Sequence, residues 1–332
     1  MKLIHASITA VGGWVPEDRL TNHDLERMVD TNDEWITTRT GIKERRILKE
    51  KDKGTSFMAA KAVLEMCQKA NLNPKEIDVV ICATATPDMG FVSTANLVCA
   101  EVGAHNALSF DLAAACSGFI YALETGSNFI RSGNYKKVVV IGADKMSAVM
   151  NYKDRVSCIL FGDGAACVLL EPNTEGLGVQ DALLKTDGSG QDLLRVKLGG
   201  SAYPITKENC MSDEKYFYQA GPVVFKHAVT KMADAAAELI KRNDIKGDDI
   251  DWLVPHQANM RIIDATVNRI GMRKDRVTIN IERYGNTTGA TIPLCLWEWE
   301  KTFKKGDNLL LCAFGGGFTW GALYLKWAYS NN

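Results

Sequence analysis

The chain repeats part of its own pattern after 173 residues, and this repeat limits the folds that it can adopt. Three pairs of positions with the same local surroundings carry the repeat: Ile77 and Ile250, Gly133 and Gly306, and Gly142 and Gly315. Between them, the apolar helix predicted over 118–131 aligns without gaps with 291–304. Two copies of one βα unit are therefore predicted, each about half of the chain.

Predicted helices and strands alternate along both copies, and the strands are apolar without a break, as at 79–83 and 138–140. Strands of this kind are typical of sheets that are covered on both faces. Two such halves packed face to face predict an α/β fold with five layers, α/β/α/β/α. Two mixed sheets would enclose two buried central helices, which begin at Cys116 and Thr291.

The same pattern divides the chain into three parts. Residues 1–172 and 222–332 are the two predicted halves, and 173–221 interrupts the repeat with many glycines and charges. Such composition favours loops, so we predict a crossover with an insertion that shapes the substrate site. Near the start of the chain we expect a strand at 3–11, and the apolar run at 108–112 predicts a buried strand just before Cys116.

Composition excludes several classes of function. The 332 residues are 46% hydrophobic and 24% charged, as in ordinary globular proteins, and the net charge of −1 indicates neither a nucleic-acid nor an anionic-membrane partner. No run approaches the roughly 18 apolar residues that span a bilayer, and no signal-peptide core is present. The nine cysteines are odd in number and contain no CxxC pair, which argues against disulfides and zinc. We expect a cytoplasmic protein without a metal.

Cys116 is the candidate nucleophile. At the first turn of a buried helix, backbone N–H groups and the helix dipole favour a thiolate, and small neighbours leave room for a substrate. Most free cysteines in apolar surroundings are inert, so the assignment depends on partners elsewhere. His256 ends a predicted buried strand, where a structural histidine is as good an interpretation as a functional one.

Four loop motifs together resemble those of the β-ketoacyl-acyl carrier protein synthase III family of the thiolase superfamily. They are Ala114-Ala115-Cys116-Ser117-Gly118, Pro255-His256-Gln257-Ala258-Asn259, Gly285-Asn286-Thr287 and Phe314-Gly315-Gly316-Gly317-Phe318-Thr319-Trp320-Gly321. Segments 29–42 and 161–166 also resemble the family, and the similarity extends from about residue 5 to 327. The resemblance implies a duplicated thiolase-like fold. It also implies a decarboxylating Claisen condensation that starts type II fatty acid synthesis.

In that reaction, acetyl-CoA or a related short or branched acyl-CoA condenses with malonyl-acyl carrier protein to give a 3-ketoacyl-carrier protein. The resemblance implies a catalytic set of Cys116, His256 and Asn286, with an acyl group held on Cys116. Backbone N–H groups of Cys116 and Gly316 would form the oxyanion hole. We expect His256 to act as a neutral donor with a lowered pKa. Acyl-CoA is a substrate here, so no cofactor is expected.

The resemblance also implies three groups of binding residues. Trp35, Arg39 and Arg155 would bind CoA, although Trp35 alone is equally a core residue and Arg155 a surface charge. Residues expected to bind an acidic carrier protein are Lys226, Gln257, Arg261, Arg269, Arg273 and Lys274, although a basic run is more often only a solvated face. Phe91 would cross a homodimer interface and close the partner's acyl pocket.

Three other interpretations stay open at this stage. A relative with the same three side chains could make a secondary metabolite from another primer or extender. A scaffold of the same fold without activity is the second, and a cysteine hydrolase with a Cys-His-Asn set is the third. A hydrolase does not need the duplicated halves, and a scaffold does not need all three side chains.

Overall fold

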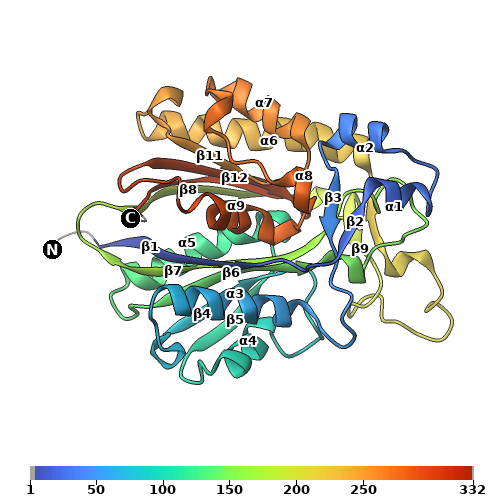
Figure 1. The fold of residues 1–332 in the computed structure, drawn as a ribbon, viewed down its shortest axis with the longest axis horizontal. Helices are drawn as coiled ribbons and strands as arrows, with labels where there is room; N and C mark the ends of the chain where they lie inside the picture. Colours follow the sequence, from blue (N-terminus) through green and yellow to red (C-terminus); the bar gives the residue numbers. More distant parts are fainter. Residues whose placement is uncertain (1–3, 331–332) are drawn as a thin grey trace.

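The structure, a computed structural model, describes residues 4–330. Two open sheets are stacked with helices between them and on both outer faces (Figure 1). The first sheet has the order β1-β7-β6-β4-β5 and the second the order β11-β12-β13-β8. The strands of the first sheet are β1 His5–Trp14, β4 Val79–Ala83, β5 Leu108–Leu112, β6 Val138–Lys145 and β7 Asp163–Asn173. Those of the second are β8 Gly178–Thr186, β11 Trp252–Pro255, β12 Asn308–Gly315 and β13 Thr319–Lys326.

The helices complete five layers. Helices α5 (Gly118–Arg131) and α9 (Thr291–Trp299) lie between the sheets, where each contacts strands of both. The outer helices are α3 Thr55–Lys69 and α4 Thr94–Val102 on the first sheet and α6 Gly221–Arg242 and α7 Met260–Ile270 on the second. Smaller elements at one end are β2 Arg19–Thr21, α1 Asn22–Glu26, α2 Asp33–Thr40, β3 Glu44–Arg46, β9 Leu194–Val196, β10 Phe217–Gln219 and α8 Ile281–Tyr284. The predicted five-layer α/β fold is confirmed.

The two central helices begin with the same local structure. Short 3₁₀ turns, η2 (Ala115–Ser117) and η8 (Thr288–Ala290), precede α5 and α9 and are separated by the 173-residue offset. The first residue of each turn has a positive φ, 46° at Ala115 and 54° at Thr288, which is uncommon for residues other than glycine. The repeat in the sequence therefore marks a repeated backbone conformation at the centre of the molecule.

Two glycines let each half approach the central helix of the other. A Cβ atom on Gly142 in β6 would lie 2.2 Å from the carbonyl oxygen of Gly289 in η8. A Cβ atom on Gly315 in β12 would lie 2.7 Å from the backbone nitrogen of Cys116 in η2. Only a residue without a side chain permits these contacts, which explains why glycine occurs at both repeated positions.

Two predicted elements differ from the structure. Strand β5 is not buried but forms an edge of the first sheet, and Leu108 is 44% exposed. The helix predicted over 291–304 ends at Trp299, because the chain turns there and brings Phe303 into the core between Trp252 and Trp327.

Two other segments extend beyond their predicted limits or contain an additional strand. Strand β1 continues through both glycines to Trp14, beyond the predicted end at residue 11, and Leu3 lies outside the described residues. The segment 173–221 contains β8, which pairs with β13 and so contributes a strand to the second sheet. The division at 172 and 221 stays a prediction.

Candidate active site

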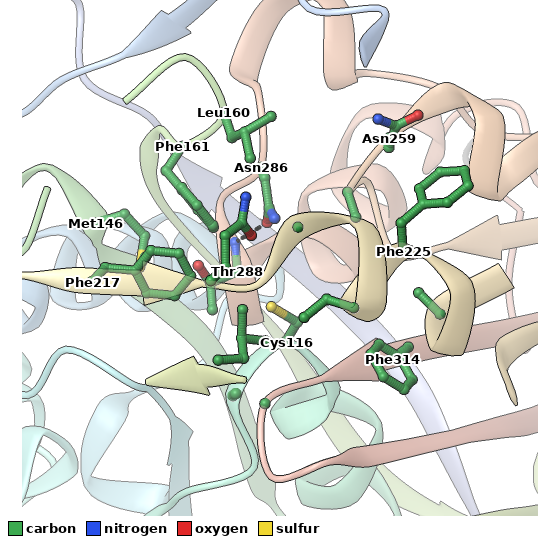
Figure 2. Close-up of a pocket in the computed structure, with 18 of the residues that line it drawn as sticks. Cys116, Met146, Leu160, Phe161, Phe217, Phe225, Asn259, Asn286, Thr288 and Phe314 are labelled. Carbon is green, nitrogen blue, oxygen red and sulfur yellow. Dashed lines mark hydrogen bonds between the residues drawn. The ribbon is translucent and has the colours of Figure 1, made fainter. Parts of the chain in front are cut away.

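Cys116, His256 and Asn286 line one cavity of about 670 Å³ between the two halves. Figure 2 shows Cys116 and Asn286 in this cavity. Cys116 lies in η2 at the start of α5, His256 directly follows β11, and Asn286 lies in the loop before η8. The three residues are far apart in the sequence and meet because equivalent ends of the two halves face each other. The predicted grouping of these side chains is therefore present in the fold.

The Cys116 side chain is in an apolar, enclosed position. The residue is 8% exposed, and burial, with a smaller effect of the Asp144 carboxylate, raises the pKa of its thiol to about 12. The resting protein therefore carries a protonated thiol near neutral pH. The expectation that the helix start favours a resting thiolate is wrong, because removal from water disfavours the charged form more strongly.

His256 is 2% exposed, and burial lowers the pKa of its imidazole to about 3. The expected lowered pKa is confirmed, and the ring is neutral near pH 7. Its Nδ1 atom lies 2.7 Å from the hydroxyl oxygen of Thr291, the first residue of α9. The ring also lines the cavity, so its second nitrogen is the one that can meet a substrate.

Asn286 is oriented by backbone contacts with the first half. Its N–H donates to the carbonyl of Leu160 at 2.8 Å, and its carbonyl accepts from the N–H of Gly162 at 3.1 Å. The side-chain oxygen accepts from the N–H of Thr288 at 2.9 Å (Figure 2). Since the oxygen is occupied in this way, the amide NH₂ group is the end that can donate to a substrate.

The glycine loop after β12 forms another part of the cavity wall. Gly316 lines the cavity, and a Cβ atom there would lie 3.5 Å from the Cβ of Ala115, next to Cys116 in the sequence. The two residues predicted to supply oxyanion-hole N–H groups, Cys116 and Gly316, are thus on adjacent segments. Both segments are drawn together by the close approach of Gly315 to η2.

Aromatic and basic side chains occupy the rim of the cavity. The guanidinium carbons of Arg39 and Arg155 lie 5.0 and 5.1 Å from the centre of the Trp35 ring. Trp35 and Arg39 line the cavity. Arg155 does not line it but lies over the Trp35 ring, and it forms an ion pair with Asp30 at 3.1 Å. Both arginines predicted to bind CoA therefore lie against the ring of the third predicted residue, Trp35.

The predicted carrier-protein residues are not equivalent in the structure. Arg261 lines the cavity and lies over the Phe225 ring at 4.5 Å, and Lys226 follows Phe225 on α6. Neither Lys226 nor Arg261 has an acidic partner within residues 4–330. Three others are paired with carboxylates: Arg269 with Asp234 at 3.0 Å, Arg273 with Asp275 at 2.5 Å, and Lys274 with Asp264 at 2.9 Å.

Gln257 cannot contact a docked protein. Its side chain is completely buried, donates to the carbonyls of Pro255 and Thr278 and accepts from the N–H of Asn280 at 3.1 Å. The prediction that it binds the carrier protein is wrong, because its side chain has no exposed surface. The side chain instead holds the loop to neighbouring backbone.

Phe91 lies outside this cavity and is fully exposed, with a φ of 79°. Met89 and Val92 beside it are also exposed, at 52% and 39%. A large apolar side chain presented in this way is unusual unless another surface covers it.

Sequence reasoning missed two buried polar residues near the site. Thr291 contacts His256, as described above. The Asp144 carboxylate accepts from the N–H groups of Ala85 and Gly289 at 2.7 and 2.8 Å and from two threonine hydroxyls. Burial raises its pKa to about 6. A carboxylate within the apolar run 138–144 was the signal that could have identified it.

The described residues form neither a metal site nor a membrane-spanning helix. Among residues 4–330, no three histidine, cysteine or carboxylate side chains gather where they could hold a metal ion. No helix in the same range is both long and apolar enough to cross a membrane. The cytoplasmic location stays a prediction.

Duplicated halves with a cysteine, a histidine and an asparagine at their junction define a condensing acyltransferase of the thiolase-like class. Family models for 3-oxoacyl-[acyl-carrier-protein] synthase III match residues 110–188, and for its C-terminal part residues 240–327. β-Ketoacyl-[acyl-carrier-protein] synthase III of Porphyromonas gingivalis is 55% identical, over 100% of this chain and 99% of the relative. The chain belongs to the β-ketoacyl-[acyl-carrier-protein] synthase III family.

Solved structures agree with this assignment. The 3-oxoacyl-[acyl-carrier-protein] synthase III of Aquifex aeolicus is 42% identical with a TM-score of 0.89, covering 97% of this chain and 100% of that chain. The Thermus thermophilus enzyme is 41% identical with a TM-score of 0.90, covering 97% and 99%. The resemblance inferred from the four motifs is confirmed.

Proposed function

We propose that this protein condenses an acyl-CoA primer with malonyl-acyl carrier protein, with loss of carbon dioxide, to give a 3-ketoacyl-carrier protein. This reaction starts type II fatty acid synthesis. The observation that carries the proposal is the meeting of Cys116, His256 and Asn286 in one cavity of a member of this family. The acyl group is held on Cys116 between two stages.

In the first stage, the Cys116 sulfur bonds to the thioester carbonyl carbon, and the bond from that carbon to the CoA sulfur breaks. The thiol proton ends on the departing CoA sulfur. Because burial keeps the resting thiol protonated, loss of the proton accompanies attack. Backbone N–H groups of Cys116 and Gly316 donate to the oxyanion that forms at the carbonyl oxygen.

In the second stage, the bond between the malonyl methylene carbon and its carboxylate breaks, carbon dioxide leaves, and the electron pair forms an enolate. His256 and Asn286 donate hydrogen bonds to the enolate oxygen. The enolate carbon then bonds to the acyl carbonyl, the bond to the Cys116 sulfur breaks, and the thiolate takes up from solvent the one proton that the overall reaction consumes. A neutral imidazole suits this role, because decarboxylation supplies the carbanion without a strong base.

Substrates reach the cavity from the rim. Trp35, Arg39 and Arg155 hold the CoA nucleotide by stacking and by ion pairing with phosphate. The carrier protein docks over Lys226 and Arg261, whose charges are unpaired within residues 4–330. Arg269, Arg273 and Lys274 contribute less, since each is already paired with a carboxylate.

A second copy of the chain completes the acyl pocket. Exposed Phe91, Met89 and Val92 form an apolar group, and edge strand β5 carries Leu108, which is also exposed. Association of two copies buries these side chains and gives hydrogen-bond partners to the unpaired backbone groups of β5. In this homodimer Phe91 enters the partner's pocket.

Mass spectrometry of the Cys116 peptide after incubation with a panel of acyl-CoAs tests the function. The wild type and Cys210→Ala, whose thiol lies outside the cavity, should both gain an acyl group. Cys116→Ala should gain none, and His256→Ala should be acylated but fail to condense. Absence of an adduct in the wild type with every acyl-CoA would refute the proposal.

A further inference from the structure

His256 has one side-chain hydrogen-bond partner among the described residues, and that partner is a hydroxyl group. Its Nδ1 lies 2.7 Å from Thr291 Oγ1, and the ring is 2% exposed. A carboxylate or carbonyl partner would only accept and would place the ring proton on Nδ1. A hydroxyl can donate or accept, so its direction decides which ring nitrogen carries the proton.

Two acceptors compete for the Thr291 hydroxyl proton. One is His256 Nδ1 at 2.7 Å, and the other is the carbonyl of Thr288 at 3.1 Å. That carbonyl already accepts the backbone N–H of Thr291, which closes the η8 turn. The imidazole nitrogen has no other donor within residues 4–330, and its contact is the shorter one. With the hydroxyl turned to Thr288, Nδ1 would carry the ring proton and donate to Thr291 Oγ1, which leaves Nε2 without a proton. The donor role proposed for His256 therefore requires the hydroxyl proton at Nδ1.

We propose that Thr291 is a positioning residue whose hydroxyl donates to Nδ1 and holds His256 in the tautomer with its proton on Nε2. The inference rests on the proposed function and deepens it, because an Nε2–H group beside the Asn286 amide supplies two donors to one enolate oxygen. An acceptor at Nδ1 gives the opposite tautomer, in which Nε2 is a base, as in serine hydrolases. The hydroxyl thus makes His256 a donor.

The surroundings keep this arrangement rigid and the ring uncharged. Thr291 begins α9 directly after η8, and η8 is tied to the first half because Gly289 N–H donates to Asp144 at 2.8 Å. Burial keeps the pKa of His256 far below neutrality, so the ring carries a single proton at neutral pH. What remains to be decided is which of the two ring nitrogens of His256 carries this proton.

Nitrogen-15 NMR of protein with ring-labelled histidine measures the tautomer directly. The wild type should show a protonated Nε2 and an unprotonated Nδ1 at His256, assigned by comparison with His256→Ala. A proton on Nδ1 in the wild type overturns the inference. The proposed function would still stand if Cys116 is acylated in the same sample, so the two failures are distinguishable.

Three variants add a kinetic test. Thr291→Val keeps the shape but removes the hydroxyl, and we expect malonyl-carrier protein decarboxylation to fall about 10- to 100-fold. Acylation of Cys116 should stay within about twofold, and Thr291→Ser should restore decarboxylation to within about threefold. Thr94→Val, which removes a buried hydroxyl in α4 outside the cavity lining, is the matched control and should leave both rates unchanged.

Two kinetic results contradict the inference. One is decarboxylation by Thr291→Val at the wild-type rate. The other is an equal loss of acylation and decarboxylation that Thr291→Ser does not restore, since that pattern belongs to a purely structural residue.

Discussion

Replacing Gly315 by alanine should separate the two sheets locally and displace the nucleophile. The added Cβ would lie 2.7 Å from the backbone nitrogen of Cys116, 3.0 Å from that of Ser117 and 3.2 Å from the Cys116 Cβ. An ordinary contact is about 3.4 Å or longer, so η2 must move by about 0.7 Å. No flexible side-chain end is available to give way, because the two closest atoms belong to the backbone.

Overpacking of this kind destabilises a protein by about 1–3 kcal/mol. A shift approaching 1 Å in a reacting group lowers a rate by up to about 100-fold. We therefore expect the Tm of Gly315→Ala to fall by a few degrees and the rate of Cys116 acylation to fall about 10- to 100-fold. Calorimetry and time-resolved mass spectrometry of the Cys116 peptide measure the two effects.

Two glycine variants serve as controls. Gly200→Ala, where an added Cβ meets nothing within 4 Å, should leave both quantities unchanged. Gly142→Ala, at the repeated position, would place its Cβ 2.2 Å from the Gly289 carbonyl and should lower the Tm at least as much. A Gly315→Ala protein with the Tm and acylation rate of the wild type would refute the packing argument.

Three further predictions follow from the site. Below pH 6.5 the unfolded state protonates His256 while the native ring stays neutral until about pH 3, so this group should lower stability by about 2 kcal/mol at pH 5. Asp144, whose pKa is raised to about 6, acts in the opposite direction between pH 6 and 3.8 and so masks part of this loss in the wild type. Urea denaturation should therefore show His256→Leu gaining about 2 kcal/mol of stability relative to the wild type between pH 7 and pH 5, and an unchanged difference between the two proteins would contradict this. Trp35→Ala removes the surface on which Arg39 and Arg155 lie and should raise the KM for acyl-CoA about 5- to 30-fold with little change in kcat, whereas an unchanged KM would remove Trp35 from the CoA site. Phe91→Asp should weaken association of two copies in analytical ultracentrifugation, and an unaltered dimer would show that this side chain does not cross the interface.

Much of the site could be predicted because its signals are local. The motifs around Cys116, His256 and Asn286 are short, and the repeat indicates which loops meet. The roles of neighbouring residues were harder to predict. Gln257 adjoins His256 in the sequence, yet its side chain turns inward and is completely buried. Arg269 lies on the same helix as Arg261, yet it pairs with Asp234 on α6, and neither fact has a local signal.

The sequence alone indicated the duplicated architecture through its spacing, and its motifs indicated the three side chains at the centre through their resemblance to a known family. Only the tertiary structure decided how these groups are charged and held. Burial keeps Cys116 protonated and His256 neutral, although a helix start by itself favours a thiolate. Desolvation and hydrogen bonding depend on atoms that distant segments supply, such as Thr291 beside His256 and Gly315 beside Cys116.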